Sequence, residues 1–315
     1  MSKLEDLRLE LKNLGAKYAK IKSLPASERK GYGEQLNAQK ATLLAKIKAL
    51  EDSAESAKVT SIDLTAPFSS NSSNSHFSSG TIHPLTVELD RVAEIYRLMG
   101  FNVIESRQLD DEFHMFESLN FPTDHPARDG YDTFRTSEGF IPPAQTSTMQ
   151  YRALTRFRSN LDAIGHIAVA IPGRTFRNED VDATHEHTFY QCEGVYVSKD
   201  ANLGQLLFVL KTFFETYYGQ SLHIKTQPGF FPFTEPSLEF QIEKPASLGG
   251  KGDGWLEMCG CGMIHPNVLN TAGIDPKVYR GFAWGGGIDR LIMLRYGIND
   301  IRYLESGKLA FLKEF

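Results

Sequence analysis

The sequence predicts an α+β fold, in which helices pack against an antiparallel β-sheet and an antiparallel pair of helices precedes this body. Strand-like segments occur at 166–171, 189–197, 223–226 and 238–242, and only one long helical segment, 203–218, lies among them. Strands and helices therefore do not alternate regularly, which favours an antiparallel sheet over a doubly wound parallel one. The heptad-like spacing of hydrophobic residues near the N-terminus predicts the helix pair.

The composition is typical of a globular protein with one large or two smaller domains. Of 315 residues, 41% are hydrophobic and 23% are charged, so the chain can bury a core that is stable without disulfides. Three cysteines are too few for a disulfide framework and indicate a reducing compartment. The sequence lacks both a run of about 18 apolar residues and the apolar core of a secretory signal. We therefore expect a cytoplasmic protein that does not enter membranes.

Residues 1–52 predict a hairpin of two helices. The first hydrophobic stripe consists of Leu4, Leu7, Leu11, Leu14, Tyr18 and Ile21, and the second of Leu36, Leu43, Ile47 and Leu50. Pro25 and the cluster around Gly31 and Gly33 are expected to break the helix between them. Because a hairpin of this size buries little surface, it is expected to be a coiled-coil arm on a larger body, or a helix pair for dimerisation.

The N-terminal hairpin is basic although the chain as a whole is acidic. Residues 1–52 hold 11 Lys and Arg against 7 Asp and Glu, so they carry +4 and leave −9 on the rest of a chain whose net charge is −5. This asymmetry suggests that the hairpin meets an anionic partner. A lysine-rich helix face that is merely solvated would look the same.

Residues 53–81 predict a flexible linker, and 82–315 the main domain. Seven of the eleven residues from 69 to 79 are serine, and such a sequence cannot bury enough surface to offset the entropy of ordering. In the main domain, Pro84 is expected to open the first helix and Gly100 to end it.

Two clusters of polar residues are candidates for chemistry. Arg177 follows a predicted strand, and its planar, always charged guanidinium suits a phosphate. Glu179 could orient a substrate group there, although an Arg and a Glu two residues apart often form a plain surface pair. On the strand that follows, Phe189, Gln191 and Glu193 share one face, which is either a pocket wall or an exposed surface.

Two further clusters combine glycine with aromatic or charged residues. The three phenylalanines between Gly229 and Pro236 predict a rigid aromatic loop that walls an apolar pocket or plugs the core. Three glycines, 285–287, precede a helix that carries Arg290, so that backbone can approach a ligand and the helix N-terminus favours an anion. Arg290 opposes the helix dipole, which a bound phosphate would explain. The segment fits neither the dinucleotide nor the P-loop pattern, and a tight packing turn is the alternative.

In their order along the chain, these segments resemble the bacterial phenylalanyl-tRNA synthetase alpha subunits, a family of class II aminoacyl-tRNA synthetases. The matching stretches are 119–120, 125–129, 132–134, 176–185, 255–257, 262–266 and 279–283. The resemblance runs from about residue 83 to the last residue, and a coiled-coil arm ahead of it also suits the family. Many motifs in the right order make the resemblance more specific than any one motif.

The resemblance implies a two-step ligase reaction. ATP and phenylalanine would form phenylalanyl-adenylate and pyrophosphate, with Mg²⁺ assisting, and the acyl group would then move to the tRNA for phenylalanine. A hydrophobic pocket rejects an added hydroxyl only about 100-fold, so tyrosine has to be removed by proofreading. The family places proofreading on a larger beta subunit, which implies an assembly of two alpha and two beta chains.

The resemblance also implies roles for individual residues. For ATP, it implies Arg177 at the α-phosphate, Arg290 at the γ-phosphate, Phe189 on the adenine, and Glu179 and His185 beside the nucleotide; Arg177, Glu179 and Arg290 are the expected catalytic residues. For phenylalanine, it implies Gln191, Glu193, Ser147 and Gln150 at the ammonium, and Phe231, Phe233, Ala283 and Gly285 around the ring. It further implies Glu235 as a Mg²⁺ ligand and Lys12, Lys17, Lys20 and Lys46 as tRNA contacts.

The chain departs from the family pattern at four places. It has Ser106, Arg107 and Gln108 where Gly-Pro-Glu is usual, Arg135 where tryptophan is usual, Gln145 where histidine is usual, and Asp289 for a common glutamate. These departures keep a second interpretation open, that of a non-catalytic paralogue that binds an amino acid or tRNA as a regulator. Retention of both Arg177 and Arg290 favours catalysis.

The cysteines do not match a zinc site. Cys259 and Cys261 are one residue apart and Cys192 is distant, which is not the spacing of a four-ligand site. We expect them in the core or in the lining of a pocket.

Overall fold

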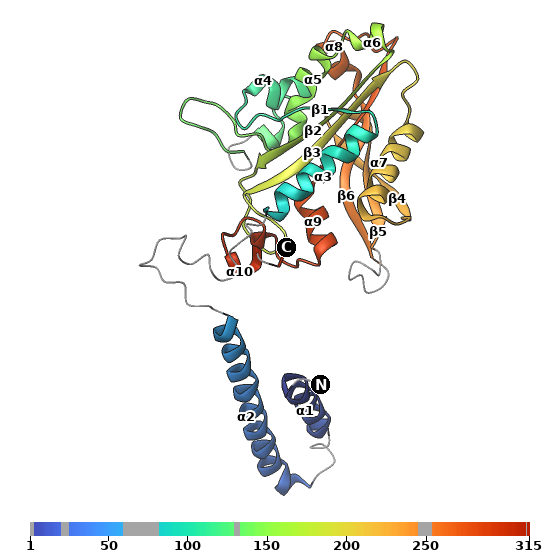
Figure 1. The fold of residues 1–315 in the computed structure, drawn as a ribbon. Helices are drawn as coiled ribbons and strands as arrows, with labels where there is room; N and C mark the ends of the chain where they lie inside the picture. Colours follow the sequence, from blue (N-terminus) through green and yellow to red (C-terminus); the bar gives the residue numbers. More distant parts are fainter. Residues whose placement is uncertain (1–2, 20–24, 59–81, 129–132, 245–253, 313) are drawn as a thin grey trace, which may run out of the picture. The chain divides into compact units, whose positions relative to one another are not determined.

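The chain forms two compact units, Met1–Gly80 and Thr81–Phe315. The computed structural model describes residues 3–19, 25–58, 82–128, 133–244, 254–312 and 314–315 (Figure 1).

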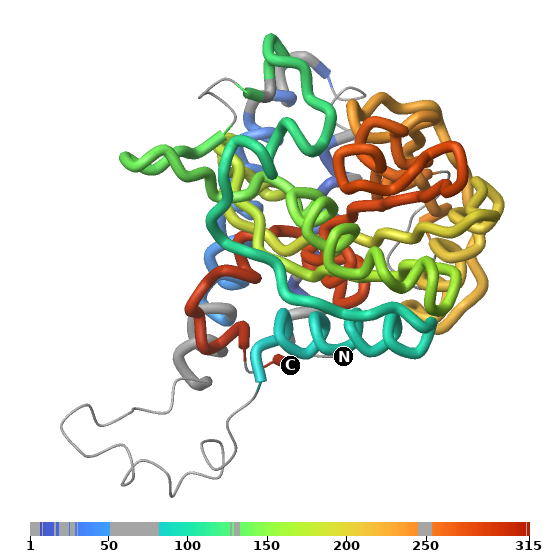
Figure 2. The backbone as a smooth tube through the Cα atoms, turned by 90° about the horizontal axis from the view of Figure 1, so that it is seen from above, coloured from blue at the N-terminus to red at the C-terminus, as the bar shows by residue number. Residues whose placement is uncertain are grey.

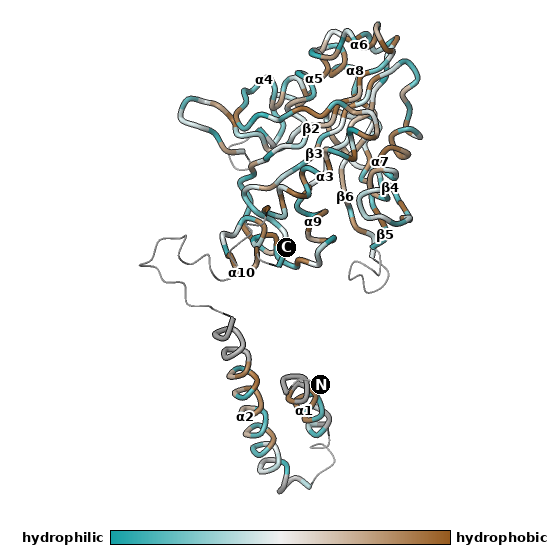
Figure 3. Tube along the Cα trace, viewed as in Figure 1, coloured by the Kyte–Doolittle hydropathy of each residue, from teal (hydrophilic) through white to brown (hydrophobic). Residues whose placement is uncertain are grey.

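The N-terminal unit contains a pair of helices, α1 (Lys3–Ala19) and α2 (Ala26–Lys58). Leu14 packs with Leu36 and Leu43 in a small buried cluster, and Tyr18 Oη donates a hydrogen bond of 2.7 Å to Asn37 Oδ1. The hydrophobic residues of α2 recur along the helix, as the brown segments in Figure 3 show. The predicted stripes therefore meet, and this pairing carries the stability of the hairpin.

Two expectations for this unit are wrong. Gly31 and Gly33 lie inside α2 and do not break it. A Cβ at either position would meet nothing within 4 Å, so a glycine there costs only helix propensity, about 1 kcal/mol, which the packing of α2 outweighs. The helix also runs on to Lys58, so the first six residues of the predicted linker are helical. The remainder of the predicted linker and Ile21 lie outside the described residues.

The main unit is built on a seven-stranded sheet with the order β1-β2-β3-β7-β6-β5-β4. The strands are β1 (Asn102–Val103), β2 (His166–Phe176), β3 (Thr188–Ser198), β4 (Ile224–Phe231), β5 (Thr234–Glu243), β6 (Trp255–Ile264) and β7 (Arg280–Gly287). The β1–β2 pair is parallel and the other five pairs are antiparallel. The predicted antiparallel sheet is thus confirmed, with one short parallel strand at its edge.

Three helices cover one face of this sheet. They are α3 (Pro84–Leu98), α7 (Leu203–Tyr218) and α9 (Ile288–Tyr296), and Figure 2 shows α3 in cyan along one side of the unit. Their apolar stripes enclose a core that includes Tyr96, Phe213 and Trp284. Helix α3 begins at Pro84 as predicted, and Gly100 follows its end with a left-handed φ of 88°.

Short helices cover part of the opposite face. They are α5 (Gln150–Arg156), α6 (Asn160–Ala163), α8 (Pro266–Thr271) and the 3₁₀ helices η3 (Glu117–Leu119) and η5 (Thr146–Met149). Their side chains form a second core with Val195, Val197 and Ala283. The remaining short helices are α4 (Glu112–Met115), η4 (Pro126–Arg128), η7 (Ile301–Tyr303) and α10 (Leu309–Leu312).

The aromatic segment differs from its prediction as a loop. Phe231 ends β4 and Thr234 begins β5, so the phenylalanines belong to a tight hairpin, hydrogen-bonded into the sheet. The three glycines 285–287 precede a helix as predicted, but they lie in a strand and not in a turn, because β7 runs through Gly287 directly into α9.

Candidate active site

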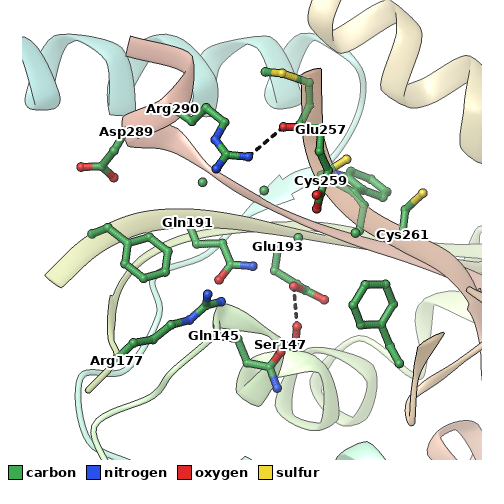
Figure 4. Close-up of a pocket in the computed structure, with 18 of the residues that line it drawn as sticks. Gln145, Ser147, Arg177, Gln191, Glu193, Glu257, Cys259, Cys261, Asp289 and Arg290 are labelled. Carbon is green, nitrogen blue, oxygen red and sulfur yellow. Dashed lines mark hydrogen bonds between the residues drawn. The ribbon is translucent and has the colours of Figure 1, made fainter. Parts of the chain in front are cut away.

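A cavity of about 400 Å³ opens on the face of the sheet that the short helices leave partly uncovered. Its floor is formed by the neighbouring strands β3, β7 and β6, and its rim by the start of α9 and by the segment after β2. Figure 4 shows Gln191 and Glu193 side by side on β3, facing this space. The face that alternation predicted for Phe189, Gln191 and Glu193 is therefore a pocket wall.

Glu193 is a deeply buried acid of the pocket, with 1% of its surface exposed. Ser147 Oγ donates to its Oε2 at 2.7 Å, and Gln150 Nε2 donates to its Oε1 at 2.5 Å. Burial raises the pKa of Glu193 to about 8, although both hydrogen bonds oppose the shift. Burial thus favours the protonated carboxyl group near neutral pH, and a cation beside it would favour the charged carboxylate.

Arg177 forms one side of the pocket. Its Nε donates to the carbonyl oxygen of Ala144 at 3.0 Å, and its guanidinium lies 4.9 Å from the ring centre of Phe189. Glu179 lies 3.6 Å from the Nη1 atom. Burial lowers the pKa of Arg177 and Glu179 opposes this, but a guanidinium stays charged at neutral pH. The group is held at its base while its end remains available to a ligand.

Arg290 and Arg177 lie on opposite sides of Gln191 in Figure 4. Its Nη1 donates to the carbonyl oxygen of Glu257 at 2.9 Å, which holds the first turn of α9 against β6. Beside it, Asp289 is buried and accepts a hydrogen bond of 2.5 Å from the backbone nitrogen of Tyr190. Burial raises the pKa of Asp289 to about 7. Two fixed cations therefore face one cavity from elements more than 100 residues apart in the sequence.

The floor of the pocket consists largely of glycine, and the neighbouring side chains explain why. A Cβ at Gly285 would lie 2.5 Å from Gln191 Nε2 and 2.8 Å from Glu193 Oε2. A Cβ at Gly260 would lie 2.6 Å from the ring of Phe231. Any larger residue at either position would displace a polar or aromatic wall of the pocket.

Phe231 and Phe233 form the apolar end of the cavity. Their rings are stacked, with centres 5.8 Å apart, and both line the pocket together with Ala283. Phe233 and Ala283 also belong to the second core. The aromatic segment therefore both walls the pocket and fills part of the core, so both interpretations of its sequence apply.

The structure brings most of the predicted site residues together. Those that line the cavity are Arg177, Glu179, His185, Phe189, Arg290, Ser147, Gln191, Glu193, Phe231, Phe233, Ala283 and Gly285. Gln150 lies behind the lining and reaches it through Glu193. The functional roles of these residues stay predictions.

The predicted metal and tRNA residues lie elsewhere. Glu235 is outside the cavity lining, with 77% of its side chain exposed and its carboxylate 3.6 Å from His265 Nε2. Lys12, Lys17 and Lys46 are exposed on α1 and α2, and Lys20 lies outside the described residues.

Several lining residues had no predicted role. They include Thr184, Glu186, Thr234, Glu257 and Gly260. The pairing of β6 with β7 brings Glu257 and Gly260 to the cavity, and strand order cannot be read from local pattern. The signal available was the run of small residues, 259–262, in a strand-like segment.

The departures from the family pattern fall into different places. Gln145 lines the cavity, whereas Arg135 forms an ion pair with Glu112 outside it. The three cysteines are buried, and burial raises the pKa of Cys192 and Cys259 above the ordinary value of a thiol. Within the described residues, no group of three metal-ligating side chains contains a cysteine.

Comparison with known proteins identifies relatives of the whole main unit. Residues 62–315 match the family model of the tRNA synthetases class II core domain (F). The chain is 42% identical over 241 residues to a phenylalanine–tRNA ligase alpha subunit of Leptospira biflexa, covering 75% of this chain and 69% of the relative. It is 36% identical to that of Vibrio cholerae, covering 100% of this chain and 90% of the relative, and 42% identical to that of Shouchella clausii.

None of the described helices combines the length and the hydropathy that crossing a bilayer requires.

Proposed function

The chain belongs to the family of phenylalanine–tRNA ligase alpha subunits, built on the class II synthetase core, and from this we propose how its pocket works. In the proposal, the cavity binds ATP and phenylalanine together, and the amino-acid carboxylate attacks the α-phosphorus. The P–O bond to pyrophosphate breaks as the new one forms, giving phenylalanyl-adenylate. The acyl group then moves to the terminal adenosine of the tRNA for phenylalanine.

ATP lies between the two arginines in this proposal. The transition state gathers negative charge on the phosphoryl oxygens, so fixed cations that are already in place lower its free energy. Arg177 faces the α-phosphate and Arg290 the far end of the triphosphate, while Phe189 offers a ring for the adenine. Glu179 and His185 line the same end of the cavity and would orient the nucleotide.

The ammonium of phenylalanine lies at Glu193 in this proposal. The buried carboxyl group, with its pKa near 8, is ready to lose its proton when a cation arrives, and Ser147 and Gln150 hold both of its oxygens. Gln191, whose Oε1 is buried and has no hydrogen-bond partner among the described residues, provides an acceptor beside it. The benzyl ring then extends toward Phe231, Phe233 and Ala283.

Mg²⁺ belongs to the proposal as the ion that accompanies ATP, where it would neutralise phosphate charge. The predicted ligand Glu235 does not fit an ion inside the cavity, because its carboxylate is exposed outside the lining. Glu257 fits better, since it is one of the residues that line the cavity, and its backbone carbonyl accepts a hydrogen bond from Arg290. Outside the cavity, the Asp110–Asp111–His114 cluster offers three possible ligand atoms, but Asp110 is already bound by Arg152 through two hydrogen bonds.

The proposal includes partners. A beta subunit would complete an assembly of two alpha and two beta chains in the cytoplasm, and the exposed Lys12, Lys17 and Lys46 would contact tRNA. Replacing these three lysines by glutamate should then slow aminoacylation and reduce the salt dependence of tRNA binding. The rate of adenylation should not change. Equal loss in both steps would contradict the tRNA role.

The observation that best supports this function is the buried, doubly hydrogen-bonded Glu193 between two arginines and an apolar slot. The test is amino-acid-dependent ATP–pyrophosphate exchange, across the standard amino acids, by the chain assembled with its beta subunit. We expect exchange with phenylalanine and weak exchange with tyrosine. Amino-acid or tRNA binding without exchange would instead identify a regulatory paralogue.

A further inference from the structure

Asn120 ties the aromatic hairpin to a segment that lies far from it in the sequence. Its side-chain Nδ2 donates a hydrogen bond of 2.7 Å to the carbonyl oxygen of Pro232, which lies 112 residues later. Its Oδ1 in turn accepts a hydrogen bond of 2.9 Å from Asn267 Nδ2. Both ends of the amide are thus used, and this fixes which way the group points.

Pro232 is the residue between the two phenylalanines of the slot. The neighbouring carbonyl groups are held from the same half of the sheet: that of Phe233 accepts from the backbone nitrogen of His265 at 2.9 Å, and that of Phe231 from Ser237 Oγ at 3.4 Å. The bond from Asn120 comes from outside this half. It therefore fixes the turn relative to the rest of the pocket, which the other two bonds cannot do.

The residues on either side of Asn120 make the same connection through apolar contacts. Leu119 is fully buried in the core that also contains Phe233 and Ala283. The ring centre of Phe121 lies 6.0 Å from that of Phe233. The segment 119–121 thus supports the hairpin by packing and, at its middle residue, by a directed hydrogen bond.

The backbone of Asn120 is in an unusual conformation that restricts the residue type. Its φ of 60° lies in the left-handed region, and within the described residues no other non-glycine residue has a positive φ. Glycine, asparagine and aspartate adopt this conformation at low cost. Of these three, only asparagine also supplies a side-chain donor for the carbonyl of Pro232.

We propose that Asn120 is a positioning residue that holds the Phe231–Phe233 turn at the apolar end of the cavity. It thereby sets the selectivity of the slot formed by Phe231, Phe233 and Ala283 for the phenylalanine ring. The inference rests on the proposed function, in which this slot takes a benzyl group. Asn120 itself touches no substrate in this arrangement. It acts by keeping the two rings at a fixed distance from Ala283.

Glycine and aspartate both tolerate the left-handed backbone conformation at position 120, so they can replace Asn120 without straining the backbone. Asn120→Gly keeps the left-handed conformation and removes the whole side chain, while Asn120→Asp keeps an acceptor for Asn267 and removes the donor to Pro232. In exchange assays with the beta subunit present, both should raise the KM for phenylalanine about 3- to 10-fold, the range of one hydrogen bond. The KM for ATP should change less than about 2-fold, because no hydrogen bond to the nucleotide end is lost.

Selectivity and matched controls separate this role from loss of stability. The ratio of kcat/KM for phenylalanine to kcat/KM for tyrosine should fall in both Asn120 variants. In Asn267→Ala this ratio should also fall, but by less. Asn102→Ala removes a comparable bond, from Asn102 Nδ2 to the carbonyl of Ala168 at 3.3 Å, away from the pocket, and should leave both KM values unchanged.

Two results would overturn the proposal: an unchanged KM for phenylalanine in both Asn120 variants, or an equal rise in the KM values of both substrates. If the unsubstituted enzyme shows no phenylalanine-dependent exchange, the proposed function fails, and this role fails with it. Normal exchange with variants that match the unsubstituted enzyme refutes only the role of Asn120.

Discussion

The two faces of strands β3 and β7 serve different purposes, although their residues alternate along the same backbone. On the helix-covered face, Trp284 fills a core between Tyr96 and Phe101, and its Nε1 donates to Tyr96 Oη at 2.9 Å. On the other face, its neighbours Ala283 and Gly285 leave open space above Glu193. One face gains stability from large, buried side chains, and the other gives up that stability for a cavity with a buried acid whose pKa is raised.

The comparison predicts that the core face dominates stability. Trp284→Ala should lower the free energy of unfolding by about 3–5 kcal/mol, because it removes a buried indole and leaves a cavity. Urea unfolding of the purified protein measures this, with Trp284→Phe as the milder control. A loss below about 1 kcal/mol would mean that the core repacks around the space.

The pocket face should dominate activity in turn. Arg290→Ala should slow pyrophosphate exchange about 10²- to 10³-fold, the range for removing one preorganised charge at a developing anion. The free energy of unfolding should change little, since the hydrogen bond that the guanidinium makes to Glu257 lies at an exposed position. Arg302→Ala, at an exposed arginine paired with Asp300, is the control and should keep full activity. If Arg290→Ala unfolds the protein, Arg290 contributes to stability as well as to activity, and the separation of stability and activity between the two faces does not hold at α9.

Because of the buried Glu193, the free energy of unfolding of the ligand-free enzyme should fall with rising pH. Burial raises the pKa of Glu193 from 4.5 to about 8, so between these values the folded chain holds a proton that the unfolded chain has lost. The contribution is present below pH 4.5 and is lost as the pH passes 8. From pH 6 to 8 the wild type should lose about 2 kcal/mol relative to Glu193→Gln, which has no proton to lose.

Thermal or urea unfolding of both proteins at each pH measures this difference. Parallel pH profiles for the wild type and Glu193→Gln would show that Glu193 is charged in the folded protein throughout. Phenylalanine should reduce the pH dependence of the wild type, because its ammonium stabilises the carboxylate.

The smallest predicted effect concerns the size of the slot. Ala283→Gly removes one methyl group from the wall and should improve kcat/KM for para-chlorophenylalanine about 10-fold, in the range of one methylene in a pocket. Exchange with phenylalanine should fall only slightly. An unaltered substrate range would place the ring of the substrate away from Ala283.

Much of this division could be predicted from the sequence, because alternation along a strand is a local property. The face shared by Gln191 and Glu193, the helix 203–218 and the antiparallel sheet all follow from short-range pattern. The break expected at Gly31 and Gly33 was wrong because packing of α2 against α1 outweighs the propensity of two glycines.

What could not be predicted depends on strand order and long-range contacts. Glu257 and Gly260 reach the cavity because β6 lies beside β7, and Asn120 reaches Pro232 across 112 residues of chain. The raised pKa of Glu193 depends on burial by several elements at once, which a local motif does not reveal. The family resemblance supplied residue identities but assigned no role to these positions.

The absence of side chains at Gly260 and Gly285 also limits how the substrate range can evolve. A larger residue at either position displaces Phe231, Gln191 or Glu193. It would therefore weaken the binding of every amino acid and not change the preference among them. Ala283 differs, because it can become smaller without displacing a neighbour. New specificities in this lineage would therefore be reached through position 283, and drift at the two glycines would be removed by selection.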